Sequence, residues 1–281
     1  MPIVLAFACA VVYGVADYCG GSASRRAPAL VVTITGQMAS LIVGLVVVLI
    51  IGTPLPGGRD MLWGATAGVA SAVALSAFYY ALSHGSMTVV SPVTAVTSAV
   101  IPVVYGLAAG ERPGGLAYVG MVLAIVAVAL VSGAVGTRHV ATRASTILFA
   151  LLAGLGFAVI FIALGKTHSA SGVWPLVSSR LTSVVLLGGF MVVTRRGVRG
   201  HMSAWRIAAL AGTLDMSANF LYLLAVHRGL LSIVVVVVAL YPVSTVVLAF
   251  GLDRERVSRS QAIGMALAFG SLVLVSLAGS T

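Results

Sequence analysis

Ionisable side chains are scarce in this chain, and acidic ones are the scarcest. Only 8% of the residues are charged, with six Asp and Glu against 16 Lys and Arg among 281 residues. Soluble globular domains carry about 25% charged residues, so this composition excludes that class. The net charge of +10 lies mostly in short segments between apolar stretches, where it indicates membrane topology rather than nucleic-acid binding.

Cysteine clusters and catalytic motifs are also missing. The two cysteines, Cys9 and Cys19, lie in the first apolar stretch and indicate neither a disulfide framework nor a metal site. No P-loop, dinucleotide fingerprint, His/Cys metal cluster or activated nucleophile is visible in the sequence. We therefore expect no catalytic residues, no metal and no cofactor.

An intramembrane enzyme is a remote alternative, because Asp17 and Asp215 lie in apolar stretches. An aspartyl protease needs two close carboxylates that share a proton. Such proteases typically show a G-x-G-D neighbourhood, whereas Asp17 stands in GVADY and Asp215 in GTLDMS. The sequence therefore disfavours this enzyme class.

Long apolar runs are what the chain has in abundance. Each is about 20 residues long, which is enough to cross the roughly 30 Å hydrocarbon core of a bilayer, and Gly, Pro and charge clusters separate them. The pattern predicts an all-α polytopic protein of the cell membrane, of the bacterial inner-membrane type, with lipid as its surroundings. The ten predicted transmembrane helices are 3–22, 29–51, 61–82, 87–108, 115–134, 145–165, 172–194, 204–226, 231–251 and 259–279.

The chain also repeats itself at an offset of 144 residues. From Asp60 to Ser132 the overlay needs no gap, and Glu111 falls on Glu255. The prediction is two five-helix repeats, 1–134 and 145–281, joined by a loop at 135–144. Because five is an odd number, the second repeat must enter the membrane from the opposite side. Transporters built from inverted repeats bind their substrates at the repeat interface.

Several motifs carry a family resemblance. They are G-E-R at Gly110–Arg112, D-R-E-R at Asp253–Arg256, the G-M-x-L-A segments at Gly120–Ala124 and Gly264–Ala268, Ser91-Pro92 and Tyr13-Gly14. Together they resemble the drug/metabolite transporter superfamily, specifically its EamA-like ten-helix members. The resemblance implies a secondary carrier of small molecules with a central cavity lined by both halves. It also implies dimer contacts through the last helix of each half, and a homodimer stays open.

Two positions depart from the family pattern. Tyr13 stands where the first helix often carries Trp, and Gln37 stands where the second often carries Arg, while Arg180 fills the matching place in the seventh helix. Orientation is open as well. The family implies cytoplasmic termini, but ten arginines follow the odd-numbered helices 1, 5, 7 and 9 against four basic residues after helices 2, 4, 6 and 8. That count predicts termini outside.

Charged residues inside the spans are the main site candidates. Asp215 lies near the middle of its helix, with Asn219 and Tyr222 on the same face, and serves either function or interhelical packing. Arg180 either snorkels to the interface, pairs with Asp215 as a lock or gate, or holds an anionic group. Asp17 is either an interfacial carboxylate or a proton or cation site.

Polar and aromatic residues complete the candidate set. Ser91 and Ser98 in the fourth helix contact either a cavity or the backbone of their own helix. Tyr80 and Tyr241 are candidates for lining a cavity, where a phenol ring also offers cation–π attraction. Tyr13 and Gln37 join the set through the family pattern.

The sequence leaves three functions in order of preference. The first is a secondary active transporter that exports or exchanges a small metabolite or drug, with a proton coupled through Asp17 or Asp215. The second is an uncoupled facilitator for metabolites or amino acids, and the third is the intramembrane enzyme. Few intramembrane carboxylates and one deep arginine favour a neutral, zwitterionic or weakly anionic substrate.

Overall fold

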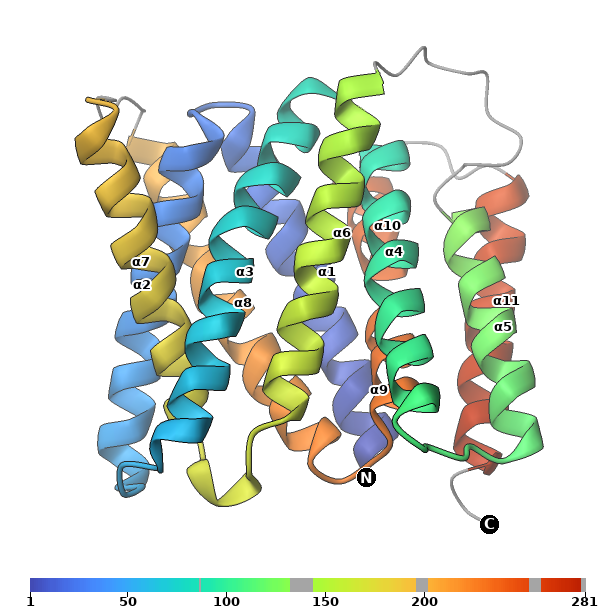
Figure 1. Ribbon diagram of the computed structural model, residues 1–281. Helices are drawn as coiled ribbons and strands as arrows, with labels where there is room; N and C mark the ends of the chain where they lie inside the picture. Colours follow the sequence, from blue (N-terminus) through green and yellow to red (C-terminus); the bar gives the residue numbers. More distant parts are fainter. Residues whose placement is uncertain (86, 132–143, 196–201, 253–258, 279–281) are drawn as a thin grey trace.

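Helices account for the whole architecture of the described chain (Figure 1). The computed structural model describes residues 1–85, 87–131, 144–195, 202–252 and 259–278. A single 3₁₀ turn, η1 (Ser169–Ser171), precedes α7. The α-helices are α1 (Pro2–Ser24), α2 (Ala29–Ile51), α3 (Gly58–His84), α4 (Met87–Ala108), α5 (Gly115–Val131), α6 (Ala144–Gly165), α7 (Trp174–Val193), α8 (Met202–Val226), α9 (Leu231–Val238), α10 (Tyr241–Leu252) and α11 (Arg259–Ala278).

The fold confirms ten spans in two repeats, with one correction. Helices α1, α2, α3, α6, α7 and α8 are long and apolar enough to cross a membrane, and the remaining spans are shorter apolar helices. The prediction of one helix over 231–251 is wrong, because a turn at Ala239–Leu240 divides it into α9 and α10. Pro242 explains the break, since it lacks an N–H and its ring clashes with the carbonyl four residues earlier. Its counterpart in the first repeat is Ser98, and α4 runs through that position unbroken.

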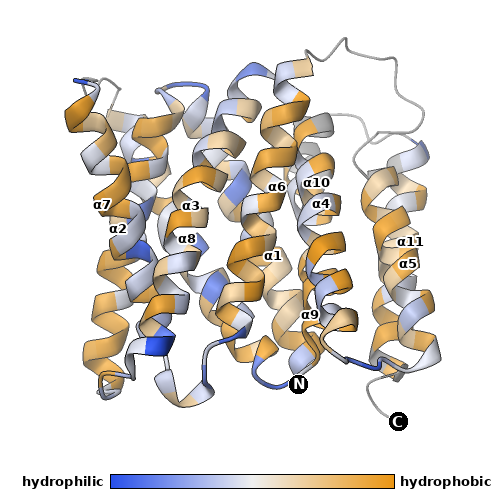
Figure 2. Ribbon diagram, in the orientation of Figure 1, coloured by the Kyte–Doolittle hydropathy of each residue, from blue (hydrophilic) through white to orange (hydrophobic). Residues whose placement is uncertain are grey.

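Apolar side chains cover the outside of the bundle as well as its interior. Val4, Leu49 and Phe269 are among many large apolar residues that are exposed. Figure 2 shows hydrophobic residues along the length of the helices and hydrophilic residues mainly at the turns. An outer surface of this kind is stable against lipid chains rather than water.

Two helix crossings join the repeats at very short range. Gly212 of α8 packs directly on the backbone of Gly36 in α2, and Gly68 of α3 packs on the carbonyl of Ser179 in α7. These crossings are counterparts, because Gly212 and Gly68 are 144 residues apart and Gly36 and Ser179 are 143 apart. Small residues let membrane helices approach this closely. The duplicated sequence therefore builds the same crossing twice.

A carboxylate of the first repeat caps a helix of the second. Glu111, in the loop between α4 and α5, accepts hydrogen bonds from the backbone N–H groups of Leu231 at 2.8 Å and Ser232 at 3.0 Å, at the start of α9. An anion satisfies the free N–H groups of a helix N-terminus and interacts favourably with its dipole. Gly106 leaves room for this carboxylate, since a Cβ there would lie 2.6 Å from Glu111 Oε2. The G-E-R motif thus holds the two repeats together.

The glycine crossing can be tested with a one-carbon change. We expect Gly212→Ala to lower the thermal unfolding temperature strongly, because the new Cβ would overlap the carbonyl of Gly36 in the facing helix. Gly189→Ala in α7 is the matched control, since nothing lies within 4 Å of its Cβ position. Removing that helical glycine should be neutral or stabilise by up to about 1 kcal/mol. Equal unfolding temperatures for the two variants, measured in detergent, would contradict the close crossing.

Candidate functional site

Three buried polar residues and one partly exposed carboxylate, from four different helices, meet where the two crossings adjoin. They are Gln37 of α2, Ser71 of α3, Arg180 of α7 and Asp215 of α8, and we call them the central polar cluster. Arg180 Nη2 forms an ion pair with Asp215 Oδ2 at 2.8 Å. Arg180 Nη1 donates to Ser71 Oγ at 3.1 Å and to Gln37 Oε1 at 3.4 Å. Gln37 Nε2 donates to Ser71 Oγ at 2.8 Å, which closes the cluster.

The cluster follows the repeat symmetry of the chain. Asp215 is the counterpart of Ser71, and Arg180 is the counterpart of Gln37. The ion pair between Arg180 and Asp215 is therefore the counterpart of the hydrogen bond between Gln37 and Ser71. Exchanging the two repeats exchanges Gln37 with Arg180, so the contact between them is its own counterpart. The pseudo-twofold axis therefore passes between these two side chains. Two positions where the repeats differ in charge thus lie together at the axis.

Burial makes the ion pair strongly dependent on both partners. The side chain of Arg180 is only 2% exposed and that of Asp215 is 14% exposed. This burial excludes the interfacial, snorkelling interpretation of Arg180. Removing one partner of a buried pair leaves an uncompensated charge, which typically costs about 3–5 kcal/mol. The charges of Asp215 and Arg180 therefore compensate each other in this ion pair.

Neighbouring groups fix the orientation of Asp215. Ser40 donates to the carbonyl of Gly212 and lies 3.5 Å from Asp215 Oδ2. Asn219 Nδ2 donates to the Asp215 carbonyl at 2.8 Å and to its Oδ1 at 3.2 Å. Tyr222, one turn further, donates to the carbonyl of Phe161 in α6 at 2.7 Å. The predicted polar stripe on α8 is therefore occupied by contacts within the protein.

A second polar cluster surrounds the break between α9 and α10. Tyr241, the first residue of α10, donates to the backbone carbonyl of Ser91 in α4 at 3.3 Å. Ser91 Oγ is buried and has no hydrogen-bond partner among the described residues. The facing helix is α1, where the Cβ position of Gly14 lies 2.7 Å from the Tyr241 carbonyl oxygen. We call Asp17, Ser91 and Tyr241 the break cluster. Discontinuous helices of this kind often form the substrate and ion sites of transporters.

Asp17 lies on the same face of α1, between α10 and α3. Gly14, one turn before it, packs on Tyr241 and Ser244, and Gly20, one turn after it, packs under the Tyr79 ring. Asp17 is 8% exposed. Within the described parts of the chain, no hydrogen bond or ion pair reaches its carboxylate. Asp17 and Asp215 therefore differ sharply, because among the described residues only Asp215 of these two has a counter-ion.

The other sequence candidates lie apart from these clusters or at their edge. Tyr13 packs edge-on against Phe161, with ring centroids 6.5 Å apart. Ser98 donates to the Ala95 carbonyl within its own helix at 3.0 Å. Tyr80 is 39% exposed and stacks on His84, so it lies on an outer face of the bundle rather than at its centre.

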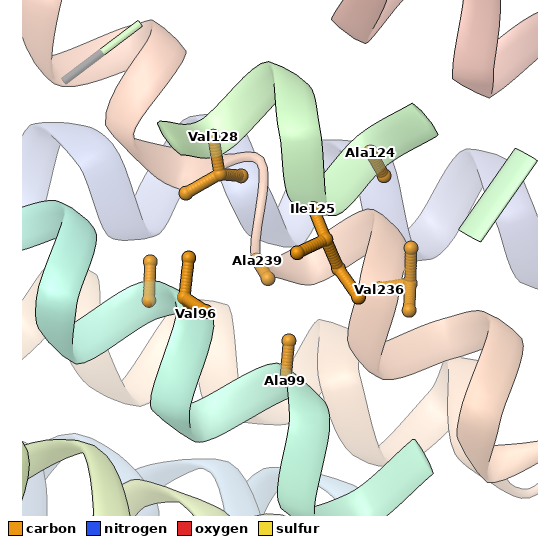
Figure 3. A pocket seen from close by; sticks show the side chains of 8 residues that line it. Val96, Ala99, Ala124, Ile125, Val128, Val236 and Ala239 are labelled. Carbon is orange, nitrogen blue, oxygen red and sulfur yellow. The ribbon is translucent and has the colours of Figure 1, made fainter. Parts of the chain in front are cut away.

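A small cavity borders the break but offers no polar group to a substrate. Its volume is about 10 Å³, and its walls are side chains of α4, α5 and the α9–α10 junction, which Figure 3 shows pointing toward one another. Val96, Ile125, Val236 and Ala239 are among them. A cavity needs about this volume to hold even one water molecule, and a bound water needs polar partners. It is therefore not a metabolite site.

Two contributions escaped the sequence analysis. Ser71 was not among the candidates from the sequence, although it binds both Gln37 and Arg180. Glu111 entered only as part of a motif, although it caps α9. The repeat overlay contained a signal for Ser71, because Ser71 aligns with Asp215 at the offset of 144 residues. The overlay alone gave no signal for the partners of Glu111.

Comparisons with known proteins agree with this architecture. The model of the EamA-like transporter family matches the chain twice, over residues 1–133 and 144–277. A solved structure described only as "Crystal structure of protein" is similar, with a TM-score of 0.79 and 16% sequence identity over 98% of each chain. At that identity the likeness shows the fold alone. No curated protein matches the chain.

The two repeats themselves supply a variant that tests the ion pair. Arg180→Gln with Asp215→Ser copies the Gln37–Ser71 pair into the second repeat. We expect each single change to cost about 3–5 kcal/mol, because it leaves a buried charge unpaired, and the double change to cost less than either. Unfolding free energies of the wild type and three variants give the coupling energy. Additive costs would show that the two side chains do not depend on each other.

Proposed function

Since this chain belongs to the EamA-like transporter family, we propose that it is a secondary active carrier of a small neutral or zwitterionic metabolite. It exports or exchanges this substrate across the cell membrane by alternating access, and a proton drives the cycle. The family makes it a multi-pass membrane transporter of the drug/metabolite type. The substrate class, direction and coupling are the proposal.

The observation that carries the proposal is the different surroundings of the two deep carboxylates. Asp215 is committed to Arg180, whereas Asp17 has no counter-ion among the described residues. A charged side chain in the middle of a bilayer costs at least about 3 kcal/mol. Asp17 can remove that cost by binding a proton, and Asp215 has no need to. We therefore assign the coupling proton to Asp17 and a structural role to Asp215.

Asp17 lies where binding a proton can change how α1 packs against α10. Its helix packs on α10 through Gly14, directly at the break in the ninth span. Half-helices at such a break carry free backbone groups that can bind a substrate. Protonation of Asp17 removes a negative charge beside these groups. The protonated and deprotonated states of Asp17 therefore favour different packings of α1 against α10. The central polar cluster lies on the pseudo-twofold axis and serves as the pivot between the repeats.

The charges at the described centre of the protein support a neutral or zwitterionic substrate. Arg180 and Asp215 cancel each other, and Asp17 is neutral when protonated. The described centre of the protein then carries no net charge, which disfavours a strongly charged ligand. The Ser91 hydroxyl, which has no partner in the described part of the chain, can offer a hydrogen bond to a neutral or zwitterionic molecule, and the Tyr241 ring offers it a flat face.

Reconstituted vesicles test both transport and coupling. Labelled amino acids, sugars, nucleosides and quaternary amines are offered with and without a pH gradient. We expect one neutral or zwitterionic class to accumulate only with the gradient. Asp17→Asn should reduce this accumulation to the level without a gradient while exchange of labelled for unlabelled substrate continues.

Ser98→Ala is the control for this experiment, because its hydroxyl bonds only to its own helix among the described contacts. Uptake that never exceeds empty liposomes across the panel would overturn the carrier. Uptake that ignores both the gradient and Asp17→Asn would select an uncoupled facilitator instead.

A further inference from the structure

A large groove lies between α3 and α7, away from both polar clusters. The two helices touch where Gly64 and Gly68 of α3 pack on the carbonyls of Pro175 and Ser179. Toward the membrane face opposite the two termini they separate, as Figure 1 shows. The hollow between them has a volume of about 960 Å³ and includes residues of α6 and of the α1–α2 connection. We call it the α3–α7 groove.

The walls of the groove are apolar and open sideways. Val73 of α3, Leu152 of α6, and Leu186 and Phe190 of α7 line it, and all four are more than a third exposed. In a membrane, apolar side chains exposed at this level face the lipid chains. A ligand can therefore enter the groove from the bilayer without passing through water.

One polar line runs up the α3 wall. Ser76, Tyr80 and His84 follow each other at four-residue spacing and all line the groove. Ser76 Oγ is shielded and lacks a hydrogen-bond partner among the described residues. The Tyr80 ring stacks on His84 at 4.2 Å and packs on Phe149 at 4.6 Å between centroids. These hydroxyls can donate to ester or phosphate oxygens.

The charge at the mouth of the groove is positive. Ser24 and Ala27 line the groove, and the two residues between them, Arg25 and Arg26, are exposed. Arg195 is exposed five residues after Phe190, at the same end of α7. No carboxylate is among the described residues that line the groove. An apolar groove with arginines at its mouth matches an anionic head on an apolar chain.

We propose that the α3–α7 groove binds an anionic phospholipid of the surrounding bilayer. An acyl chain lies between α3 and α7, and the phosphate binds at Arg25 and Arg26. Because α3 and α7 belong to different repeats, the bound lipid holds them apart on this face of the membrane. This proposal does not rest on the proposed transport function, because lipid bound in the groove can be measured without any transported substrate.

Lipid retention by the full-length protein tests the site. The protein is exchanged into detergent with equal amounts of dioleoyl phosphatidylglycerol and dioleoyl phosphatidylcholine, and bound lipids are counted by native mass spectrometry. We expect phosphatidylglycerol to be retained preferentially. Arg25→Gln with Arg26→Gln should reduce this preference about tenfold or more, because each arginine near a membrane surface contributes to anionic-lipid binding.

Two further variants locate the lipid. Val73→Trp with Ser76→Phe fills the groove and should lower retention of both lipids while the arginines remain. Arg59→Gln with Arg112→Gln removes two exposed arginines, one in the first turn of α3 and one in the connection before α5, at the opposite membrane face, and should change nothing. Thermal unfolding curves confirm that each variant is folded.

Each alternative result overturns the proposal. Equal retention of the two lipids by the wild type would show no anionic site. The same loss from Arg59→Gln with Arg112→Gln would show a general charge effect. Unchanged retention in the filled variant would place the lipid outside the groove. Loss of substrate transport in the filled variant with unchanged lipid retention would make the groove part of the transport path.

Discussion

The ion pair between Arg180 and Asp215 is the interaction on which the rest of the structure depends. Both charges lie inside a bundle whose described helices carry few others, and with side chains 2% and 14% exposed they have little access to water. They can meet only if α7 and α8 keep their rotation and depth, which the glycine crossings at Gly36–Gly212 and Gly68–Ser179 fix. Gln37 and Ser71 then complete the hydrogen bonding from the other repeat. One pair of charges thus specifies how four helices from two repeats pack.

The two repeats are similar in sequence and fold, and the candidate functional residues lie at positions where the repeats differ. The first repeat keeps a neutral Gln37–Ser71 pair where the second has an ion pair. The first repeat keeps α4 continuous at Ser98, whereas Pro242 breaks the ninth span. Asp17 has Phe161 as its counterpart, so this carboxylate, which has no counter-ion among the described residues, also belongs to one repeat only. A scaffold of two similar repeats therefore carries asymmetric sites.

Much of the fold could be predicted because it depends on local sequence. Apolar runs bounded by Gly, Pro and charges located the spans, and the boundaries agree with the structure within a few residues apart from the ninth. The break itself was missed although Pro242 was visible, because proline in a membrane helix can produce a kink as well as a break. The site was partly predictable. Gln37, Arg180 and Asp215 were candidates from the sequence and meet in the central polar cluster together with Ser71, but Tyr80 lies on the outer α3–α7 groove.

The sequence by itself determined the membrane class, the two repeats and their opposite orientation. Those properties follow from composition, from self-similarity and from an odd number of helices in each half, and none requires a contact to be known. Only the tertiary structure decided which polar side chains meet. Arg180 has a counter-ion and Asp17 has none in the described part of the chain, Glu111 contacts α9, and α3 separates from α7 on one face. The physical reason is that these outcomes depend on the rotation and spacing of helices distant in the chain, which the period of apolar residues leaves undetermined.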